Sequence, residues 1–433
     1  MKNAAVICEY NPFHNGHAYQ LSYMRKKLGV ENIIAVMSGN FVQRGEPAVF
    51  DKFIRTEMAL NSGADLVIEI PAVFSSASAR EFARAGVKTV LSTGVADMLC
   101  FGAEGGLDSE DLDSMLRLIK SGVYDDPCFN ASVREALKTG ASYPKAVSES
   151  LLKLSGHDVG GRAEFTDWPV FYNDLSSRLV NAVTLPNNIL AAEYLRALAA
   201  EEAAGSGKLE VHAISRTDAG YNSQDIPAGG EIYASATALR SIMASAADTD
   251  MRNTLSCFIP ESAAELYDSH KLMDTAVFPD DMSQILSLRL LDAKKNHKDL
   301  TAFCDVSRDI ADRLLNQADT ICGFEARAKS IKTRQYTLSR IKRALMHICL
   351  DITKEDFEKR KAGGYVSYIR LLGFKKSAAE KGLLKQLKNN SAVPVITKAA
   401  DYKELLKEDI YCDQIYYSLK NVKGEYERSP VIV

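Results

Sequence analysis

The first hundred residues alternate between short apolar runs and longer segments in which apolar residues recur at helical spacing. The apolar runs cover residues 4–8, 33–37, 66–70 and 98–101. The helical segments between them cover residues 16–28, 53–61 and 80–91. Strands that alternate with helices of this length predict βαβ units. We therefore expect an α/β fold with a parallel sheet.

Between residues 121 and 185 the alternation weakens, because Gly, Pro, Ser and Asn become frequent around the single tryptophan, Trp168. We interpret this stretch as an insertion or connecting segment with short helices. The α/β pattern then resumes, with a helix, a strand and a second helix expected at residues 187–202, 209–214 and 235–246.

Beyond Pro260 the pattern is mostly helical, and Lys and Arg become more frequent. A small C-terminal α/β piece is expected to contain strands at 393–397 and 414–419. These changes predict two domains, with residues 1–255 forming the α/β domain and residues 256–433 forming a basic, mainly helical region.

Composition places the chain among ordinary globular proteins: 433 residues, 46% apolar and 25% charged. No apolar run is long enough to span a membrane, and the N-terminus lacks a secretory signal pattern. The eight cysteines are scattered without a CxxC pair, which favours free thiols in a reducing compartment. We therefore expect a cytoplasmic protein with no membrane partner. The net charge of −3 indicates that any nucleic-acid binding must come from a local patch.

The strongest candidate for chemistry is the run EYNPFHNGH at residues 9–17, which follows the first predicted strand. A strand end, a turn and a helix N-terminus together favour anion binding, because free backbone N–H groups and the helix dipole point at the ligand. His14 and His17 are three residues apart and share one helix face. Together with Asn11 and Asn15 they would surround a triphosphate with donors and stabilise charge that develops at its α- and β-phosphates. The alternatives are two turn histidines with structural partners, or a metal site, for which no third ligand lies at a suitable spacing.

Polar residues at later strand ends and helix starts fit the same site. The run SGNFVQRG at residues 38–45 offers Arg44 to a phosphate or carboxylate, although it also suits an ordinary turn. Gly102 lies at the carboxyl end of a predicted strand, where ligands of open α/β sheets bind. Asn188 starts a helix, and either capping or a ligand contact explains it.

Two further candidates come from the second half of the α/β pattern. Arg216 follows the strand predicted at 209–214 and is a natural phosphate clamp. The run SATALR places Ser235 and Arg240 at a helix start. Capping alone explains Ser235, whereas capping combined with binding of the β- and γ-phosphates explains the whole run.

The stretch at residues 325–347 concentrates positive charge on a net acidic protein. Its candidate RNA-binding residues are Arg327, Lys329, Lys332, Arg334, Tyr336, Arg340, Lys342 and Arg343. The cations would follow phosphates and the Tyr336 ring would stack on a base. A second cluster is formed by Arg370, Lys375, Lys376, Lys381, Lys385 and Lys388, from which we expect Lys375 and Lys376 to contact RNA. A solvated helix face is the alternative for both.

The motifs HxGH, SGNFVQRGEPA, PNNIL, SATALR and the basic helical tail together resemble the bacterial tRNA(Met) cytidine acetate ligase family, a branch of the HIGH-type nucleotidyltransferases. The resemblance implies a Rossmann-like nucleotidyltransferase domain that adenylates acetate with ATP. It further implies transfer of the acetyl group to the wobble cytidine of elongator tRNA(Met), giving N4-acetylcytidine. Mg²⁺ is expected only from the chemistry of ATP.

The resemblance also assigns site residues, with His14 and His17 as the catalytic pair. The ATP loop would comprise Ile7, Cys8, Glu9, Tyr10, Asn11, Pro12, Phe13, Asn15, Gly16, Ala18, Tyr19 and Gln20. Gly102, Asn188 and Arg216 would be further ATP contacts, and Ser235 and Arg240 match the family pattern more loosely.

Two other functions compete. A small-molecule adenylyltransferase with a nucleotide or phosphopantetheine acceptor would explain HxGH equally well, but it leaves the basic region without a purpose. A non-catalytic RNA-binding protein on this scaffold would not need His14, Gly16 and His17 intact.

Overall fold

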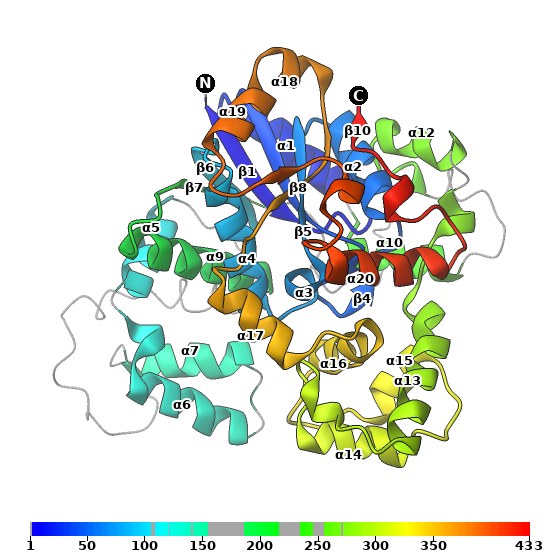
Figure 1. The fold of residues 1–433 in the computed structure, drawn as a ribbon. Coiled ribbons are helices and arrows are strands. Elements are labelled where there is room, and N and C mark those ends of the chain that lie inside the picture. Colours follow the sequence, from blue (N-terminus) through cyan, green and yellow to red (C-terminus); the bar gives the residue numbers. More distant parts are fainter. Residues whose placement is uncertain are drawn as a thin grey trace. The chain divides into compact units, whose positions relative to one another are not determined.

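The computed structural model describes residues 2–104, 109–120, 122–139, 141, 143–154, 186–215, 234–245, 255–269 and 272–433 (Figure 1). The chain forms two compact units. The first unit combines Met1–Cys100 with Thr217–Val433, and the second comprises Phe101–Arg216. The units therefore divide the chain differently from the predicted boundary at 255/256.

The core of the first unit is a parallel sheet built from the four predicted apolar runs. Strand β1 (Asn3–Cys8) lies between β2 (Asn32–Ser38) and β6 (Met98–Ala103), and β5 (Leu66–Ile70) lies beyond β2. All three pairings are parallel. The strands are almost continuously buried, as expected for a parallel sheet covered on both faces. The predicted fold class is confirmed.

The three longer helices between these strands begin at side-chain caps. Helix α1 (Asn15–Lys26) follows β1, α2 (Lys52–Asn61) precedes β5, and α4 (Ala79–Ser92) precedes β6 after the short α3 (Ala72–Ser75). Asp51 caps α2 by accepting hydrogen bonds from the N–H groups of Phe53 and Ile54. Such caps satisfy the orphan N–H groups of the first turn.

The C-terminal part of the chain completes the sheet. Strand β8 (Ile369–Phe374) is antiparallel to β5, and β10 (Val431–Ile432) and β9 (Val395–Ile396) pair in parallel with β8. The strand predicted at 393–397 is confirmed. The strand predicted at 414–419 is wrong, because these residues lie in and just after helix α20 (Lys407–Ser418). Ile410, Asp413 and Tyr417 are buried at helical spacing, and a short apolar run does not distinguish the two periods.

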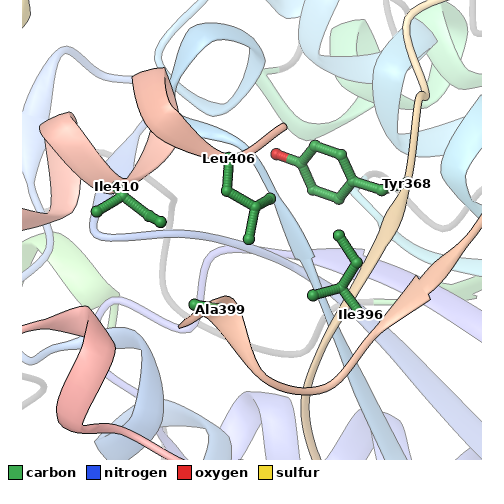
Figure 2. Packing of buried hydrophobic residues seen from close by; sticks show 5 residues of the cluster. All are labelled: Tyr368, Ile396, Ala399, Leu406 and Ile410. Atoms are coloured by element: carbon green, nitrogen blue, oxygen red, sulfur yellow. The ribbon is translucent and has the colours of Figure 1, made fainter. Parts of the chain in front are cut away.

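Helix α20 and β9 cover a local apolar cluster. Tyr368, Ile396, Ala399, Leu406 and Ile410 are all buried and point toward one another (Figure 2). The short helices α18 (Lys376–Glu380), α19 (Leu383–Asn390) and η6 (Ala399–Tyr402) connect β8 to this region. These contacts bind the last sixty residues to the sheet instead of leaving them as a separate piece.

A group of buried charges joins the same elements. The Lys52 ammonium lies 2.8 Å from Glu69 Oε1, 2.6 Å from Asp413 Oδ2 and 3.2 Å from Glu425 Oε2. Burial opposes the charged form of Lys52, but the three carboxylates raise its pKa above the usual range. The carboxylates are close enough to share a cation, and the lysine supplies it. Lys52 thereby links α2 and β5 to α20 and the turn η7 (Glu425–Glu427).

The described residues between 255 and 362 are mostly helical, as predicted. The helices are α12 (Glu261–Ser269), α13 (Ser283–Lys295), α14 (Arg308–Asn316), α15 (Phe324–Ser330), α16 (Leu338–Leu350) and α17 (Lys354–Ala362). Helix α16 is buried along its entire length from Ile341 to Leu350. In Figure 1 it is the gold helix above α14.

The second unit holds the predicted connecting segment and the resumed α/β pattern. Its elements are α5 (Ser109–Lys120), η1 (Val123–Asp125), α6 (Pro127–Lys138), α7 (Tyr143–Leu154), α9 (Pro186–Ala203) and β7 (Glu210–Ser215), which pairs with β6. The expected short helices are confirmed for α6 and α7. Residues 155–185, including Trp168, lie outside the described part of the chain.

Candidate nucleotide site and basic surface

The loop between β1 and α1 carries the EYNPFHNGH motif and is anchored at both ends. The Asn11–Pro12 peptide bond is cis, and Tyr10 adopts a φ of 49°. Asn15 N donates to Phe258 O at 2.8 Å, and Asn15 Nδ2 donates to Cys257 O at 3.0 Å. The loop therefore has a defined shape at the carboxyl end of the sheet, where ligands of open α/β folds bind.

The two motif histidines stack on each other, with ring centroids 3.7 Å apart. His14 caps α1, and its Nδ1 accepts from Gly16 N at 3.0 Å. His17 Nδ1 accepts from His14 N at 3.3 Å. Because Nδ1 is the acceptor in both rings, the neutral tautomer carries its proton on Nε2. The motif thus holds two imidazoles oriented as Nε2–H donors.

Aromatic packing fixes the His17 ring from the other side. The ring lies 4.8 Å from Tyr10 and 5.5 Å from Phe13, centroid to centroid. Tyr10 and Phe13 themselves pack edge to face at 4.8 Å and are fully buried. These residues of the predicted ATP loop therefore act as supports for His17.

The Asn11 side chain makes one structural hydrogen bond through its oxygen and keeps one nitrogen donor for a ligand. Its Oδ1 accepts from Val49 N at 2.8 Å. Its Nδ2 is buried and has no hydrogen-bond partner among the described residues. A buried amide donor without a partner is costly, so this atom is well suited to an oxygen ligand.

The other predicted loop residues divide between strand and helix. Ile7 and Cys8 end β1 and are buried, and burial raises the pKa of the Cys8 thiol well above its usual range. The neutral thiol is a poor nucleophile. Along α1, Ala18 and Gln20 are half-buried and Tyr19 is exposed.

Arg55 is a functional support that the sequence did not reveal. It is fully buried, and its guanidinium donates to Glu9 O at 2.6 Å, Ser38 O at 3.1 Å and Gly39 O. One side chain therefore fixes the backbone where both β1 and β2 end. No local signal distinguishes this arginine from others on a helix, because its acceptors are backbone carbonyls from distant segments.

Helix α10 (Ala236–Ser245) brings the predicted SATALR residues to the loop. Ser235 caps the helix by accepting from Ala238 N at 3.1 Å. Arg240 Nη1 donates to Asn11 O at 2.7 Å. The structure thus brings Arg240 and the EYNPFHNGH loop together.

Predicted ATP residues in the second unit occur where its first strand ends. Gly102 lies in β6, and Asn188 lies in the first turn of α9. Asn188 Oδ1 accepts from Glu104 N at 2.9 Å, and its Nδ2 donates to Glu104 O at 3.0 Å. Asn188 therefore fixes the backbone two residues after Gly102. Arg216 lies outside the described residues.

The run SGNFVQRGEPA folds into a two-stranded hairpin. Strands β3 (Phe41–Val42) and β4 (Glu46–Pro47) are antiparallel, and we call residues 41–47 the β3–β4 hairpin. Gln43 N donates to Glu9 Oε1 at 2.8 Å, which attaches the hairpin to the motif loop. Arg44 lies at its tip and is half-buried.

Three of the predicted RNA-binding cations are buried. Arg327 donates to Gln317 O at 2.6 Å and to Thr320 O. Arg343 Nε donates to Asp305 Oδ2 at 2.9 Å, and Lys342 Nζ donates to Glu46 Oε1 at 2.7 Å. These buried pairs argue against the predicted contact of the three side chains with phosphate and indicate a structural role.

The exposed members of the same stretch surround the link between α15 and α16. Lys329, Lys332 and Arg334 are exposed. Tyr336 donates or accepts a hydrogen bond with Ser307 Oγ at 2.9 Å, and the Arg340 guanidinium lies 4.8 Å from its ring centroid. Arg340 therefore already covers one face of the ring that was predicted to stack on a base.

Lys375 and Lys376 lie at the opposite edge of the sheet from the motif loop. Lys375 N donates to Asp65 O at 3.0 Å, and Asp65 directly precedes the amino end of β5. The motif loop, in contrast, follows the carboxyl end of β1. Lys376 is exposed and Lys375 is half-buried.

Among the described residues, no helix is long and apolar enough to cross a membrane.

Comparisons with known proteins identify the family of the chain. The family model for the HIGH nucleotidyl transferases matches residues 1–429. A tRNA(Met) cytidine acetate ligase of Acetivibrio thermocellus is 33% identical over 93% of this chain and 89% of its own. One of Clostridium perfringens is 32% identical over the full length of both chains.

A solved structure shares the fold. Thermotoga maritima TmcAL, crystallised with alpha-thio ATP, superimposes with a TM-score of 0.81 at 27% identity and covers 100% of this chain and 99% of its own. The sequence motifs, the parallel sheet and these relatives place the chain in one family. It belongs to the tRNA(Met) cytidine acetate ligases, within the HIGH nucleotidyl transferases.

Proposed function

We propose that this protein activates acetate with ATP and transfers the acetyl group to the wobble cytidine of elongator tRNA(Met), giving N4-acetylcytidine. The observation that carries the proposal is the set of donors held at one loop in a member of this family. These donors are the Nε2–H groups of His14 and His17, the buried Nδ2 of Asn11 and the guanidinium of Arg240.

In the first step a carboxylate oxygen of acetate attacks the α-phosphorus of ATP. The bond from that phosphorus to the bridging oxygen of the β-phosphate breaks, and pyrophosphate leaves. Negative charge grows on the phosphate oxygens, so fixed N–H donors stabilise the transition state more than the ground state. The stacked imidazoles of His14 and His17 would supply such donors.

We propose that Mg²⁺ binds together with ATP, through the phosphates. Two carboxylates at the loop and the adjoining hairpin already have partners: Glu9 accepts from Gln43 N and Glu46 accepts from Lys342 Nζ. Mg²⁺ prefers oxygen ligands and commonly binds through substrate phosphates and water. When bound it would neutralise the departing pyrophosphate.

In the second step the N4 amine of cytidine attacks the carbonyl carbon of acetyl-adenylate. The bond from that carbon to the AMP oxygen breaks, AMP leaves and the amine loses a proton. This step requires no cysteine nucleophile, in agreement with the buried thiol of Cys8. We propose that Lys329, Lys332 and Arg334 contact the tRNA backbone, because exposed cations bind phosphates by releasing counterions.

The test is incubation of the protein with ATP, labelled acetate and total tRNA, followed by mass analysis of the nucleosides. We expect acetate-dependent ATP–pyrophosphate exchange without tRNA, and N4-acetylcytidine when tRNA is present. Exchange driven instead by nicotinate mononucleotide or pantetheine phosphate would contradict the proposal and favour a small-molecule adenylyltransferase.

A further inference from the structure

The β3–β4 hairpin connects the motif loop to helix α16. On one side, Gln43 N is bound to the Glu9 carboxylate. On the other, Gly45 adopts a φ of 76°, and a Cβ at this position would lie 2.3 Å from Arg343 N. The close approach and the positive φ both require glycine. The hairpin is therefore in direct contact with the backbone of α16.

The Glu46 carboxylate lies between two cations from different segments. Its Oε1 accepts from Lys342 Nζ at 2.7 Å, and its Oε2 lies 3.7 Å from Arg240 Nε. The three side chains are only 11–14% exposed. Burial alone would raise the pKa of the Glu46 carboxyl, but Arg240 and Lys342 hold it below its usual range. The carboxylate is therefore charged at neutral pH.

Arg240 connects the Glu46 carboxylate to the motif loop. Its Nη1 donates to Asn11 O at 2.7 Å and its Nη2 to Thr237 Oγ1 at 3.3 Å. The guanidinium is planar, so the Glu46 carboxylate near Nε restricts the directions of the other two nitrogens. The position of Glu46 consequently affects both the cation and the backbone that face the proposed triphosphate.

We propose that Glu46 is a positioning residue for ATP: it holds Arg240 against Asn11 and is itself held by Lys342 from α16. This inference rests on the proposed nucleotide site and names a residue outside the HxGH and SATALR runs on which that site depends. Since α16 continues the basic stretch proposed to contact tRNA, the Glu46 carboxylate also links the two regions.

The experiment is a double-mutant cycle on ATP affinity, measured by calorimetry without acetate or tRNA. Glu46→Gln keeps the shape of the side chain and removes its charge. We expect Glu46→Gln to weaken ATP binding about 10-fold in the parent, and by less than about twofold when Arg240 is already Ala. Glu325→Gln is the matched control, because Glu325 is the other carboxylate bound to Lys342, whereas the carboxylate beside Arg240 is that of Glu46. It should leave ATP affinity within about twofold.

If Glu46 had only a general structural role, the ATP affinities in the cycle would follow a different pattern. Equal weakening in both backgrounds, or no weakening in the parent, overturns the inference. Should Glu46→Gln lose its secondary structure, Glu46→Asp, which keeps the charge but shortens the reach, enters the same cycle with the same criteria. A parent that binds ATP but acetylates no tRNA refutes the proposed function and leaves the inference standing. A parent that does not bind ATP refutes both.

Discussion

The motif loop and the basic stretch at 327–343 use their polar side chains in opposite ways. In the loop, His14 accepts from Gly16 N, and Arg240 donates to Asn11 O, so the polar groups bind to the loop itself. In the basic stretch, Lys342 and Arg343 turn inward to Glu46 and Asp305, whereas Lys332 and Arg334 face solvent. The members of a short motif contact one another, so their neighbours in the fold follow from the sequence. A run of cations does not show which of its members face solvent, because their acidic partners lie far away in the chain.

The largest effect is expected in the loop. His17→Ala removes one Nε2–H donor, and we expect it to lower kcat/KM for acetate-dependent ATP–pyrophosphate exchange about 1,000-fold, as loss of a transition-state donor does. Binding of tRNA should be unchanged, because the basic stretch remains intact. Lys26→Ala, at the exposed end of the same helix, is the control. If the His17→Ala variant still acetylates tRNA, the motif loop does not take part in the reaction.

The buried cations should affect stability. Arg343→Met removes the cation that contributes most to lowering the pKa of the Asp305 carboxyl, and we expect the free energy of unfolding to fall by about 3 kcal/mol. The exposed Lys332→Met should change it by less than about 0.5 kcal/mol. Urea unfolding followed by circular dichroism measures both. Equal losses of unfolding free energy in the two variants would mean that burial does not distinguish structural cations from RNA-binding cations.

The exposed cations should affect RNA binding. The combined change of Lys329, Lys332 and Arg334 to Gln should weaken tRNA binding about 10-fold and reduce the salt slope by about 2 to 3. ATP–pyrophosphate exchange should stay at the parental rate. The corresponding triple change of Lys376, Lys381 and Lys385 at the opposite edge of the sheet should cost only about threefold. If the second triple change weakens tRNA binding more than the first, the tRNA contact lies at that edge of the sheet.

The smallest effect concerns the pH dependence of Glu46. Its folded pKa lies below the ordinary value of 4.5, so its stabilising contribution is present above pH 4.5 and is lost as the pH falls through the folded value. The difference in unfolding free energy between the parent and Glu46→Gln should be about 1–2 kcal/mol at pH 7 and should shrink below pH 4.5. Urea unfolding at pH 7 and pH 4 measures it. A difference that grows in acid would contradict the assigned ion pairs.

Periodicity predicted the parallel strands and the start of α1 because each depends on a few neighbouring residues. It failed at 414–419, where buried tyrosines on α20 gave a short apolar run typical of either period. It also missed Arg55, whose acceptors are the carbonyls of Glu9, Ser38 and Gly39. Such contacts depend on the tertiary arrangement, which local spacing does not encode.

The antiparallel strand β8 has a consequence for how the chain folds during synthesis. Strand β5, with the sequence LVIEI, has β2 on one side and β8 on the other, and residues 71–368 separate β5 from β8. Until β8 leaves the ribosome, an apolar sheet edge remains open to pairing with other chains. We therefore expect nascent chains that stop before residue 369 to aggregate or to bind chaperones.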